Sequence, residues 1–215
     1  TEITALISTE TPHIRKEGTV GVPSYLTNVK VIDGETMEEL IYGEVGEICA
    51  ESKCIMAGYF GNEEATAQVL RVHKDGKTWL HTGDLGSIDE NGFITIVGRI
   101  KRMILCTENA TFHKIFPKVI EEKIEAVNGV AAAAVVGRAN DERINELVAF
   151  VVKEPFENEE KLTQDIKEFL GTCLENYEMP VEYIYADELP RTLIGKVDFR
   201  KLEEMVNYKQ NSKDY

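Results

Sequence analysis

The sequence has few basic residues, few cysteines and no long apolar run. Its 215 residues carry 24 Lys and Arg against 38 Asp and Glu, which gives a formal net charge of −14. Without a basic excess the chain is poorly suited to neutralise a phosphate backbone, so we expect no nucleic-acid partner. No apolar run approaches the roughly 20 residues that a membrane-spanning helix needs, so we expect no membrane span.

Cysteine and histidine are equally scarce, with four of each. No two cysteines form a C-x-x-C pair, which excludes a disulfide scaffold and favours reduced thiols in a cytoplasmic protein. The histidines are far apart and show no metal-ligand spacing, so the sequence predicts no metal site among them. They are His13, His73, His81 and His113.

What is present is an ordinary globular composition, with 43% apolar and 29% charged residues. This length accommodates about one to two domains. The chain opens on Thr1-Glu2-Ile3-Thr4, with neither a methionine nor turn chemistry. We therefore expect it to begin inside a larger protein.

Residues 1–98 have the pattern of short strands and turns. A helix is expected over 63–70, with Asn62 as its N-cap. Two short strands, 79–81 and 85–88, flank Thr82-Gly83-Asp84. Further strands are expected at 28–33, 44–50 and 93–97.

The pattern changes after Gly98, where helical periodicity begins to alternate with valine-rich runs. A helix starts at Pro117, and the apolar spacing from Leu162 to Leu174 marks a second amphipathic helix. The expected strands are 130–136, 147–152 and 181–185, followed by a last helix over 199–206. Together these elements predict an α+β fold, with a boundary near 98–103 and a frayed tail at 207–215.

Three short segments carry side chains suited to nucleotide chemistry. Asp84, directly after Gly83, could accept hydrogen bonds from vicinal ribose hydroxyls. Arg99, in Gly98-Arg99-Ile100-Lys101-Arg102, could meet a nucleotide at a hinge. Lys196, beside Gly195, could place a compact positive charge on a phosphate or carboxylate. Taken singly, each segment is more simply explained as an ordinary turn, a solvated linker or a surface loop.

In combination and order, these segments resemble the C-terminal third of the adenylate-forming enzymes: acyl- and aryl-CoA synthetases, adenylation domains and luciferases. The resemblance spans roughly residues 1–205, and the acyl-CoA synthetases of fatty acid metabolism look closest. The matching blocks are Thr1-Glu2, Gly43–Glu47, Gly58–Phe60, Trp79–Asp84, Asp89–Phe93, Gly98–Lys101, Phe116-Pro117 with Ile120-Glu121, and Leu189–Lys196.

The resemblance implies an architecture as well as a reaction. Residues 1–98 would be a β-rich subdomain completing a larger N-terminal domain, 99–103 a hinge, and 104–206 a small α+β cap domain. The implied enzyme is an AMP-forming ligase that converts a carboxylic acid and ATP to acyl-AMP with Mg²⁺, then transfers the acyl group to a thiol, most simply CoA.

The resemblance also implies roles for single residues. Asp84 would hold the ribose and Arg99 would support the nucleotide. Lys196 would bridge the carboxylate and the α-phosphate. Thr1 would contact the α-phosphate, and Glu2 would help to place Mg²⁺. Arg102 would be the hinge residue, where many acyl-CoA synthetases have Asp.

Two departures limit what the resemblance implies. Leu105–Lys114 lacks the glycine of the family's thiol-access loop and looks longer. The family's phosphate-binding loop and most of its acyl pocket belong upstream of Thr1, so the isolated chain is predicted to be an inactive fragment that needs the missing N-terminal portion. Three alternatives stay open: a domain that loads a carrier-protein thiol, a degenerate domain that only makes protein contacts, and a standalone nucleotide-binding module.

Overall fold

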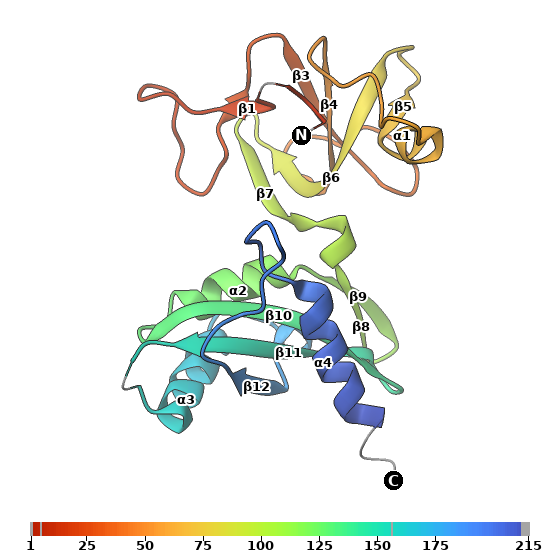
Figure 1. Cartoon of the computed structure of the whole chain (residues 1–215). Helices are drawn as coiled ribbons and strands as arrows, with labels where there is room; N and C mark the ends of the chain where they lie inside the picture. Colours follow the sequence, from red (N-terminus) through yellow and green to blue (C-terminus); the bar gives the residue numbers. More distant parts are fainter. Residues whose placement is uncertain (1, 5, 156, 212–215) are drawn as a thin grey trace. The chain divides into compact units, whose positions relative to one another are not determined.

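A computed structural model describes residues 2–4, 6–155 and 157–211 (Figure 1). The chain divides into two compact units, Thr1–Lys101 and Arg102–Tyr215, each with its own hydrophobic core. The expected α+β fold class is confirmed. In the described part of the chain, no helix is both long and apolar enough to cross a membrane.

The first unit is built on a five-stranded antiparallel sheet of order β3-β4-β6-β5, with β7 paired to β6. The helix α1 leads directly into β5 (Figure 1). Asn62 caps α1 by accepting a hydrogen bond from Ala65 N, as predicted. The elements are β1 (Ser8–Thr9), β2 (Val22–Pro23), β3 (Thr27–Ile32), β4 (Gly46–Ser52), α1 (Glu63–Val69), β5 (Leu70–Val72), β6 (Thr78–Ile88) and β7 (Ile94–Arg99).

The strand β6 corrects one prediction. The sequence predicts two short strands around Thr82-Gly83-Asp84, but β6 runs unbroken for 11 residues. Gly83 adopts a φ of +69°. The register of β6 shifts against β4 between His81 and Leu85, and against β7 between Leu85 and Gly86. The strand therefore absorbs the irregularity as a bulge, which glycine permits, instead of ending there.

The core of the first unit follows the alternation of side chains along its strands. Val31 and Ile48 pack with Ile88 and Ile94 in one cluster. Their chain neighbours face the other side of the sheet, where Ile32, Cys49 and Trp79 form a second cluster. Both faces of β3 and β4 are therefore covered.

The second unit is a three-stranded sheet of order β10-β11-β12, with β10 and β11 antiparallel and β11 and β12 parallel. The expected order helix–strand–strand–helix–strand–helix is confirmed, including Pro117 at the first turn of α2. The elements are η1 (Ile100–Arg102), β8 (Ile104–Glu108), β9 (Thr111–Ile115), α2 (Pro117–Glu125), β10 (Val130–Asn140), β11 (Ile144–Lys153), α3 (Glu159–Leu170), η2 (Asn176–Glu178), β12 (Glu182–Tyr185) and α4 (Phe199–Asn211).

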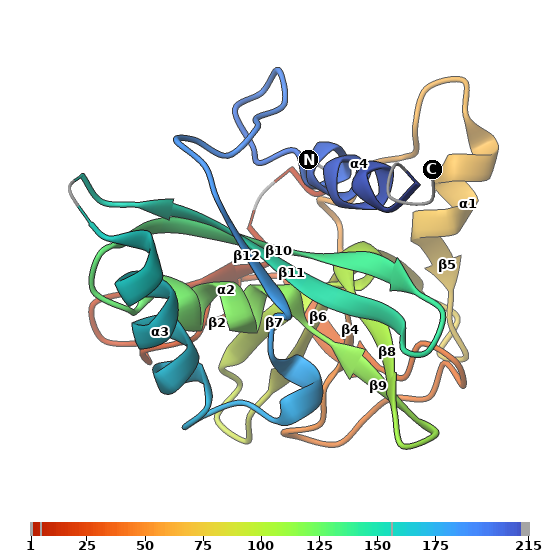
Figure 2. The same cartoon turned by 90° about the horizontal axis from the view of Figure 1, so that it is seen from below.

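Helices cover both faces of this sheet, with α2 and α3 on one side and α4 on the other (Figure 2). Alternate residues of β10 separate the two layers: Val135 packs with Ile120 and Ile166, whereas Val136 packs with Leu202. Burying a side chain of this size stabilises the fold by about 1.5–3 kcal/mol. Of the spacing that predicted α3, Leu162, Ile166 and Leu170 are buried, whereas Phe169 is exposed.

The last helix, α4, is longer than the expected helix over 199–206. It continues to Asn211, and residues 212–215 lie outside the described part of the chain. Asn207 explains the extension, because its Oδ1 accepts a hydrogen bond from Ala139 N at 3.0 Å and its Nδ2 donates to Glu203 O at 2.8 Å. Asn207, which the sequence pattern assigns to the tail, therefore links α4 to the end of β10.

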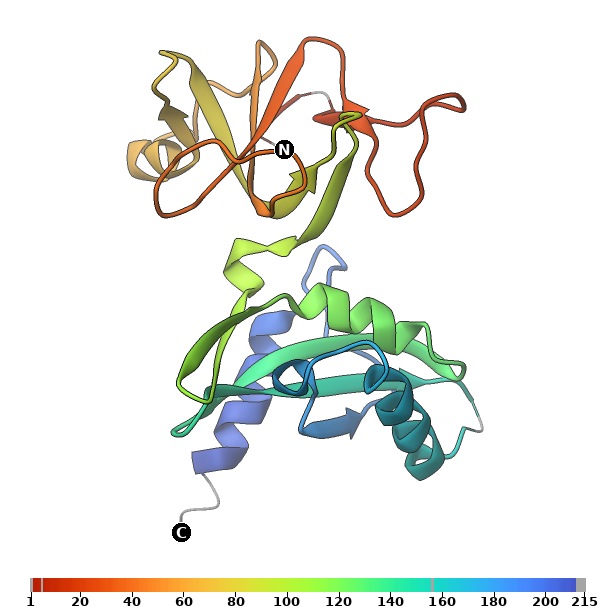
Figure 3. The same cartoon turned by 180° about the vertical axis from the view of Figure 1, so that it is seen from behind.

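Residues 104–115 form an antiparallel hairpin, β8–β9, directly after η1 (Figure 3). The sequence pattern predicts no strands in this segment. The turn consists of Asn109 and Ala110, whose φ values of 50° and 63° are those of a type I′ turn. Ala110 therefore adopts a left-handed conformation that glycine would adopt without strain.

Replacing Ala110 by glycine is expected to stabilise the second unit by about 1 kcal/mol, because an L side chain in this region costs roughly that amount. Urea unfolding followed by far-UV circular dichroism measures the change. Asn109→Gly is the matched control and should gain less, since asparagine tolerates the left-handed region. Equal or lower stability of Ala110→Gly would contradict this turn geometry.

Candidate functional site

Two of the predicted site residues form an ion pair in the first unit. Asp84 on β6 lies directly opposite Arg99 on β7, and Arg99 Nη1 donates to Asp84 Oδ1 at 2.7 Å. Their side chains are 29% and 57% exposed, so both can reach a ligand from solvent. Among the residues that the structure describes, no donor reaches Asp84 Oδ2. The pair therefore presents an acidic oxygen beside a guanidinium.

The backbone that carries Asp84 is fixed by the bulge around Gly83. Thr82 Oγ1 donates to Ile48 O at 2.7 Å and accepts from Asp84 N at 3.0 Å. Gly83 N donates to Glu47 Oε1 at 3.0 Å. A position clamped in this way does not have to be ordered when a ligand binds, which lowers the cost of binding.

Glu47 is the buried centre of this arrangement. Its other oxygen, Oε2, lies 2.8 Å from His81 Nδ1, and the residue is only 8% exposed. Burial raises the pKa of Glu47, but hydrogen bonds from His81 and Gly83 outweigh it, and the pKa lies below its usual value. Glu47 is thus an ionised positioning residue under the Asp84 bulge.

The sequence motifs include Glu47 in a matching block but assign it no role. The signal for a role is nevertheless present, because Glu47 lies on a predicted strand and Thr82-Gly83-Asp84 lies between two others. What the sequence could not supply is the register that pairs β4 with β6 and brings the carboxylate under Gly83.

The predicted lysine lies in the second unit on a tight loop. Thr192 N donates to Lys196 O at 2.7 Å, and Gly195 N donates to Thr192 O at 2.9 Å. Gly195 has a φ of +81°, and Arg191 Nη1 closes the loop on Gly195 O at 2.8 Å. Lys196 is exposed, and no carboxylate of the described residues pairs with it. Hydrogen bonds within the loop therefore fix its backbone, while the ammonium group of Lys196 stays available to a ligand.

Arg102 opens the second unit as a fixed residue. Its guanidinium makes two hydrogen bonds to the Glu121 carboxylate, at 2.6 and 3.1 Å, and a third to Val135 O at 3.2 Å. It also stacks 3.4 Å above the Phe199 ring. Arg102 therefore belongs to the body of the second unit, immediately after the point where the two units divide.

Glu2 accepts a hydrogen bond from Tyr59 Oη at 2.9 Å, and its backbone oxygen accepts one from Met56 N at 2.8 Å. The hydrogen bond from Tyr59 lowers the pKa of Glu2, which makes it an anionic oxygen donor. The other predicted residue of this segment, Thr1, lies outside the described residues.

Two parts of the chain match known protein families. Residues 119–196 match the family described as the AMP-binding enzyme C-terminal domain, and residues 1–60 match the family described as AMP-binding enzyme.

Two relatives are ligases of fatty acids. The chain is 41% identical over 177 residues to a fatty acid–[acyl-carrier-protein] ligase, ScoC, from Streptomyces coeruleorubidus, covering 81% of this chain and 31% of that protein. It is 33% identical over 197 residues to the long-chain-fatty-acid–CoA ligase of Salmonella typhimurium, covering 91% of this chain and 33% of that protein.

A solved structure agrees with the sequence relatives. The crystal structure of ATP-bound MatB from Rhodopseudomonas palustris superposes with a TM-score of 0.75 at 32% identity, covering 87% of this chain and 35% of that one. The chain thus spans about a third of the length of the proteins it matches. The resemblance seen in the sequence motifs is confirmed: the chain belongs to the AMP-binding enzyme family, and it matches parts of that family's AMP-binding domain and of its C-terminal domain.

Proposed function

We propose that the chain is the C-terminal part of an AMP-forming ligase that joins a carboxylic acid to a thiol. The observation that carries the proposal is the Asp84–Arg99 pair on its clamped bulge, because it offers an acceptor and a cation at one place. In the first half-reaction a carboxylate oxygen attacks the α-phosphorus of ATP, and the bond to pyrophosphate breaks. In the second, a thiolate attacks the acyl carbon, and AMP leaves.

Asp84 acts as the ribose acceptor. A carboxylate can accept hydrogen bonds from two vicinal hydroxyls, and the open Oδ2 is available for one of them. Arg99 donates a hydrogen bond to Oδ1 at 2.7 Å and thereby orients the carboxylate. The binding of the nucleotide would therefore depend on Asp84 directly and on Glu47 through the position of Gly83.

Lys196 acts on the first half-reaction. Negative charge builds on the α-phosphate oxygens and the attacking carboxylate, and an ammonium group placed between them stabilises that charge. The loop suits this role because its backbone is already hydrogen-bonded while its ammonium group carries no internal ion pair in the described residues. Adenylation would therefore be the step that depends on Lys196.

The two half-reactions would use different orientations of the units, with the pivot at residues 99–103. Arg102 is bound by three hydrogen bonds and a stacked ring, so it would move as part of the second unit. The backbone rotation would then occur just before it, and Arg102 would act as the fixed anchor of the hinge.

Glu2 fits the family's Mg²⁺, because an ionised carboxylate is the hard oxygen ligand that this ion takes together with substrate phosphates. Mg²⁺ supplies charge neutralisation on the triphosphate when it is bound. Thr1 would contact the α-phosphate beside Glu2.

The thiol has two candidates. CoA is the simpler acceptor, as in the long-chain-fatty-acid–CoA ligase that the chain resembles. A carrier-protein thiol is favoured by the 41% identity to an acyl-carrier-protein ligase and by the β8–β9 hairpin, which contains no glycine. Because both relatives are named as ligases of fatty acids, we propose a fatty acid as the carboxylic acid substrate. A cytoplasmic location goes with the proposal, because all four cysteines are free thiols.

Pyrophosphate release tests the proposal on the whole protein that carries these residues, assayed with ATP and a panel of fatty acids. Acid-dependent release is expected, followed by AMP release when CoA or a carrier protein with a free thiol is added. The 215-residue chain alone should release none. Absence of acid-dependent release from the whole protein would favour the degenerate domain, and robust turnover by the isolated chain would overturn its assignment as a partial enzyme.

A further inference from the structure

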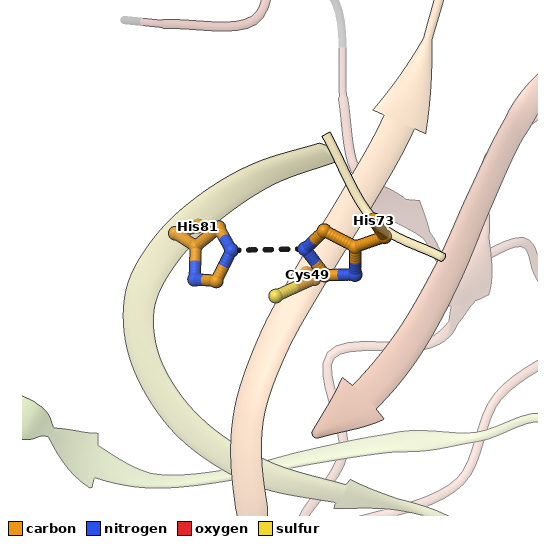
Figure 4. Close-up of side chains that lie close together, drawn as sticks. All are labelled: Cys49, His73 and His81. Atoms are coloured by element: carbon orange, nitrogen blue, oxygen red, sulfur yellow. Dashed lines mark hydrogen bonds between the residues drawn. The ribbon is translucent and has the colours of Figure 1, made fainter. Parts of the chain in front are cut away.

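Three potential metal ligands converge beneath the Asp84 bulge, although they are far apart in the sequence. Cys49 comes from β4, His73 from the turn after β5, and His81 from β6 (Figure 4). Their sulfur and ring nitrogen atoms all lie within 4.8 Å of one another. Cys49 and His81 are buried, and His73 is half-buried, which leaves the cluster a path to solvent.

The histidines already point the required atoms at one another. Nε2 of His73 lies 3.0 Å from Nε2 of His81. Two imidazoles on a tetrahedral zinc ion have their nitrogens roughly 3.3 Å apart, given bonds of about 2.0–2.1 Å. The two nitrogens are therefore within a few tenths of an ångström of the separation that such an ion needs.

Glu47 supplies the outer support that metal-bound histidines usually have. Its Oε2 lies 2.8 Å from His81 Nδ1, so His81 donates Nδ1–H to the carboxylate and presents the lone pair of Nε2 to the cluster. A carboxylate on the far nitrogen fixes the tautomer and the ring orientation and makes the imidazole a better ligand.

The charges around the cluster favour a divalent cation. Lys30 and Arg71 are the nearby cations, and Glu47 and Asp75 are the nearby carboxylates. When Cys49 binds as a thiolate, three negative charges face two positive ones. The S–H proton passes to solvent, and the hydrogen bond between the two histidines is replaced by two metal–nitrogen bonds.

We propose that Cys49, His73 and His81 bind one zinc-type divalent cation, with water completing the tetrahedron. This ligand set of one thiolate and two imidazoles suits zinc better than Mg²⁺ or Ca²⁺. The ion would join β4 to the β5–β6 turn. It would also act on the nucleotide site, because His81 and Gly83 share the Glu47 carboxylate. The metal site is independent of the ligase proposal.

Cobalt(II) titration of the 215-residue chain, after treatment with a chelator, tests this site. One equivalent of cobalt is expected to bind, with the intense visible bands of a tetrahedral site and a thiolate-to-cobalt charge-transfer band. Cys49→Ala should remove the charge-transfer band, and His73→Ala should weaken binding by at least about 100-fold. Zinc should displace the cobalt and raise the Tm of the wild-type chain.

Matched controls separate the cluster from surface binding. Cys54→Ala removes an exposed cysteine of the same unit, and His13→Ala removes an exposed histidine, and both should titrate like the wild type. If Cys49→Ala does not fold, His73→Ala still tests the site, because His73 is only half-buried and its replacement should not prevent folding. Absence of a charge-transfer band in the wild type, or unchanged cobalt binding in either ligand variant, would overturn the proposal.

Discussion

Replacing Lys196 by alanine is expected to slow acyl-adenylate formation by about 10²–10³-fold, the usual cost of removing one fixed group that stabilises developing charge. The measurement is ATP–pyrophosphate exchange by the whole protein. The second half-reaction, started from supplied acyl-AMP, should change much less, because Lys196 acts on the α-phosphate during adenylation. Stability should hold, since Lys196 is exposed and no described carboxylate pairs with it.

Lys201→Ala is the matched control for this experiment. Lys201 is an exposed lysine on α4, five residues after Lys196. Its removal changes net charge by the same amount and should leave the exchange rate unaltered. Equal losses in the two variants would assign the effect to overall charge, and the specific role of Lys196 would be wrong.

Replacing Glu121 by alanine is expected to destabilise the second unit by about 3–5 kcal/mol, the usual cost of removing one partner of a buried ion pair. The loss would leave Arg102 without two of its hydrogen bonds and Val135 N without its acceptor. Urea unfolding measures it with two probes. Far-UV circular dichroism should show an earlier transition, while the fluorescence of Trp79, the single tryptophan, should report an unchanged first unit.

Glu122→Ala is the control, because Glu122 is the next residue of α2 and its carboxylate pairs only with Lys118 among the described residues, at an exposed position. Exposed pairs of this kind contribute about 0.2–1 kcal/mol. A Glu121→Ala transition at the same urea concentration as that of Glu122→Ala would contradict the anchoring of Arg102.

Sequence patterns predicted those elements whose signals are local. Asn62 caps α1, Pro117 opens α2, and Leu162, Ile166 and Leu170 form the buried face of α3. In each case the deciding interactions lie within one helical turn or along one helix face. The periodicity extended to Leu174, but the helix ends at Leu170, where Gly171 follows.

The features that the sequence did not predict depend on contacts between distant segments. The extension of α4 depends on Asn207 meeting Ala139, and the unbroken β6 depends on its register with β4. The β8–β9 turn uses Asn109 and Ala110 without the glycine that signals such turns. Short-range patterns cannot supply these contacts.

In the candidate site, too, local patterns were predicted from the sequence and contacts between distant segments were not. The pattern around Asp84, Arg99 and Lys196 pointed to nucleotide chemistry. The sequence spacing of the histidines pointed away from a metal site. Sheet pairing nevertheless places Cys49 directly opposite His81, and the β5–β6 turn brings His73 to them. Ligands gathered by strand register leave no spacing signature in the sequence.

The most direct test of the ligase account is a single-turnover assay of the whole protein with radiolabelled ATP and a fatty acid, quenched and scored for acyl-AMP. Asp84→Ala combined with Lys196→Ala is expected to lower the rate of acyl-AMP formation well beyond either change alone. Formation of acyl-AMP by this double variant at the wild-type rate would show that neither side chain takes part in adenylation.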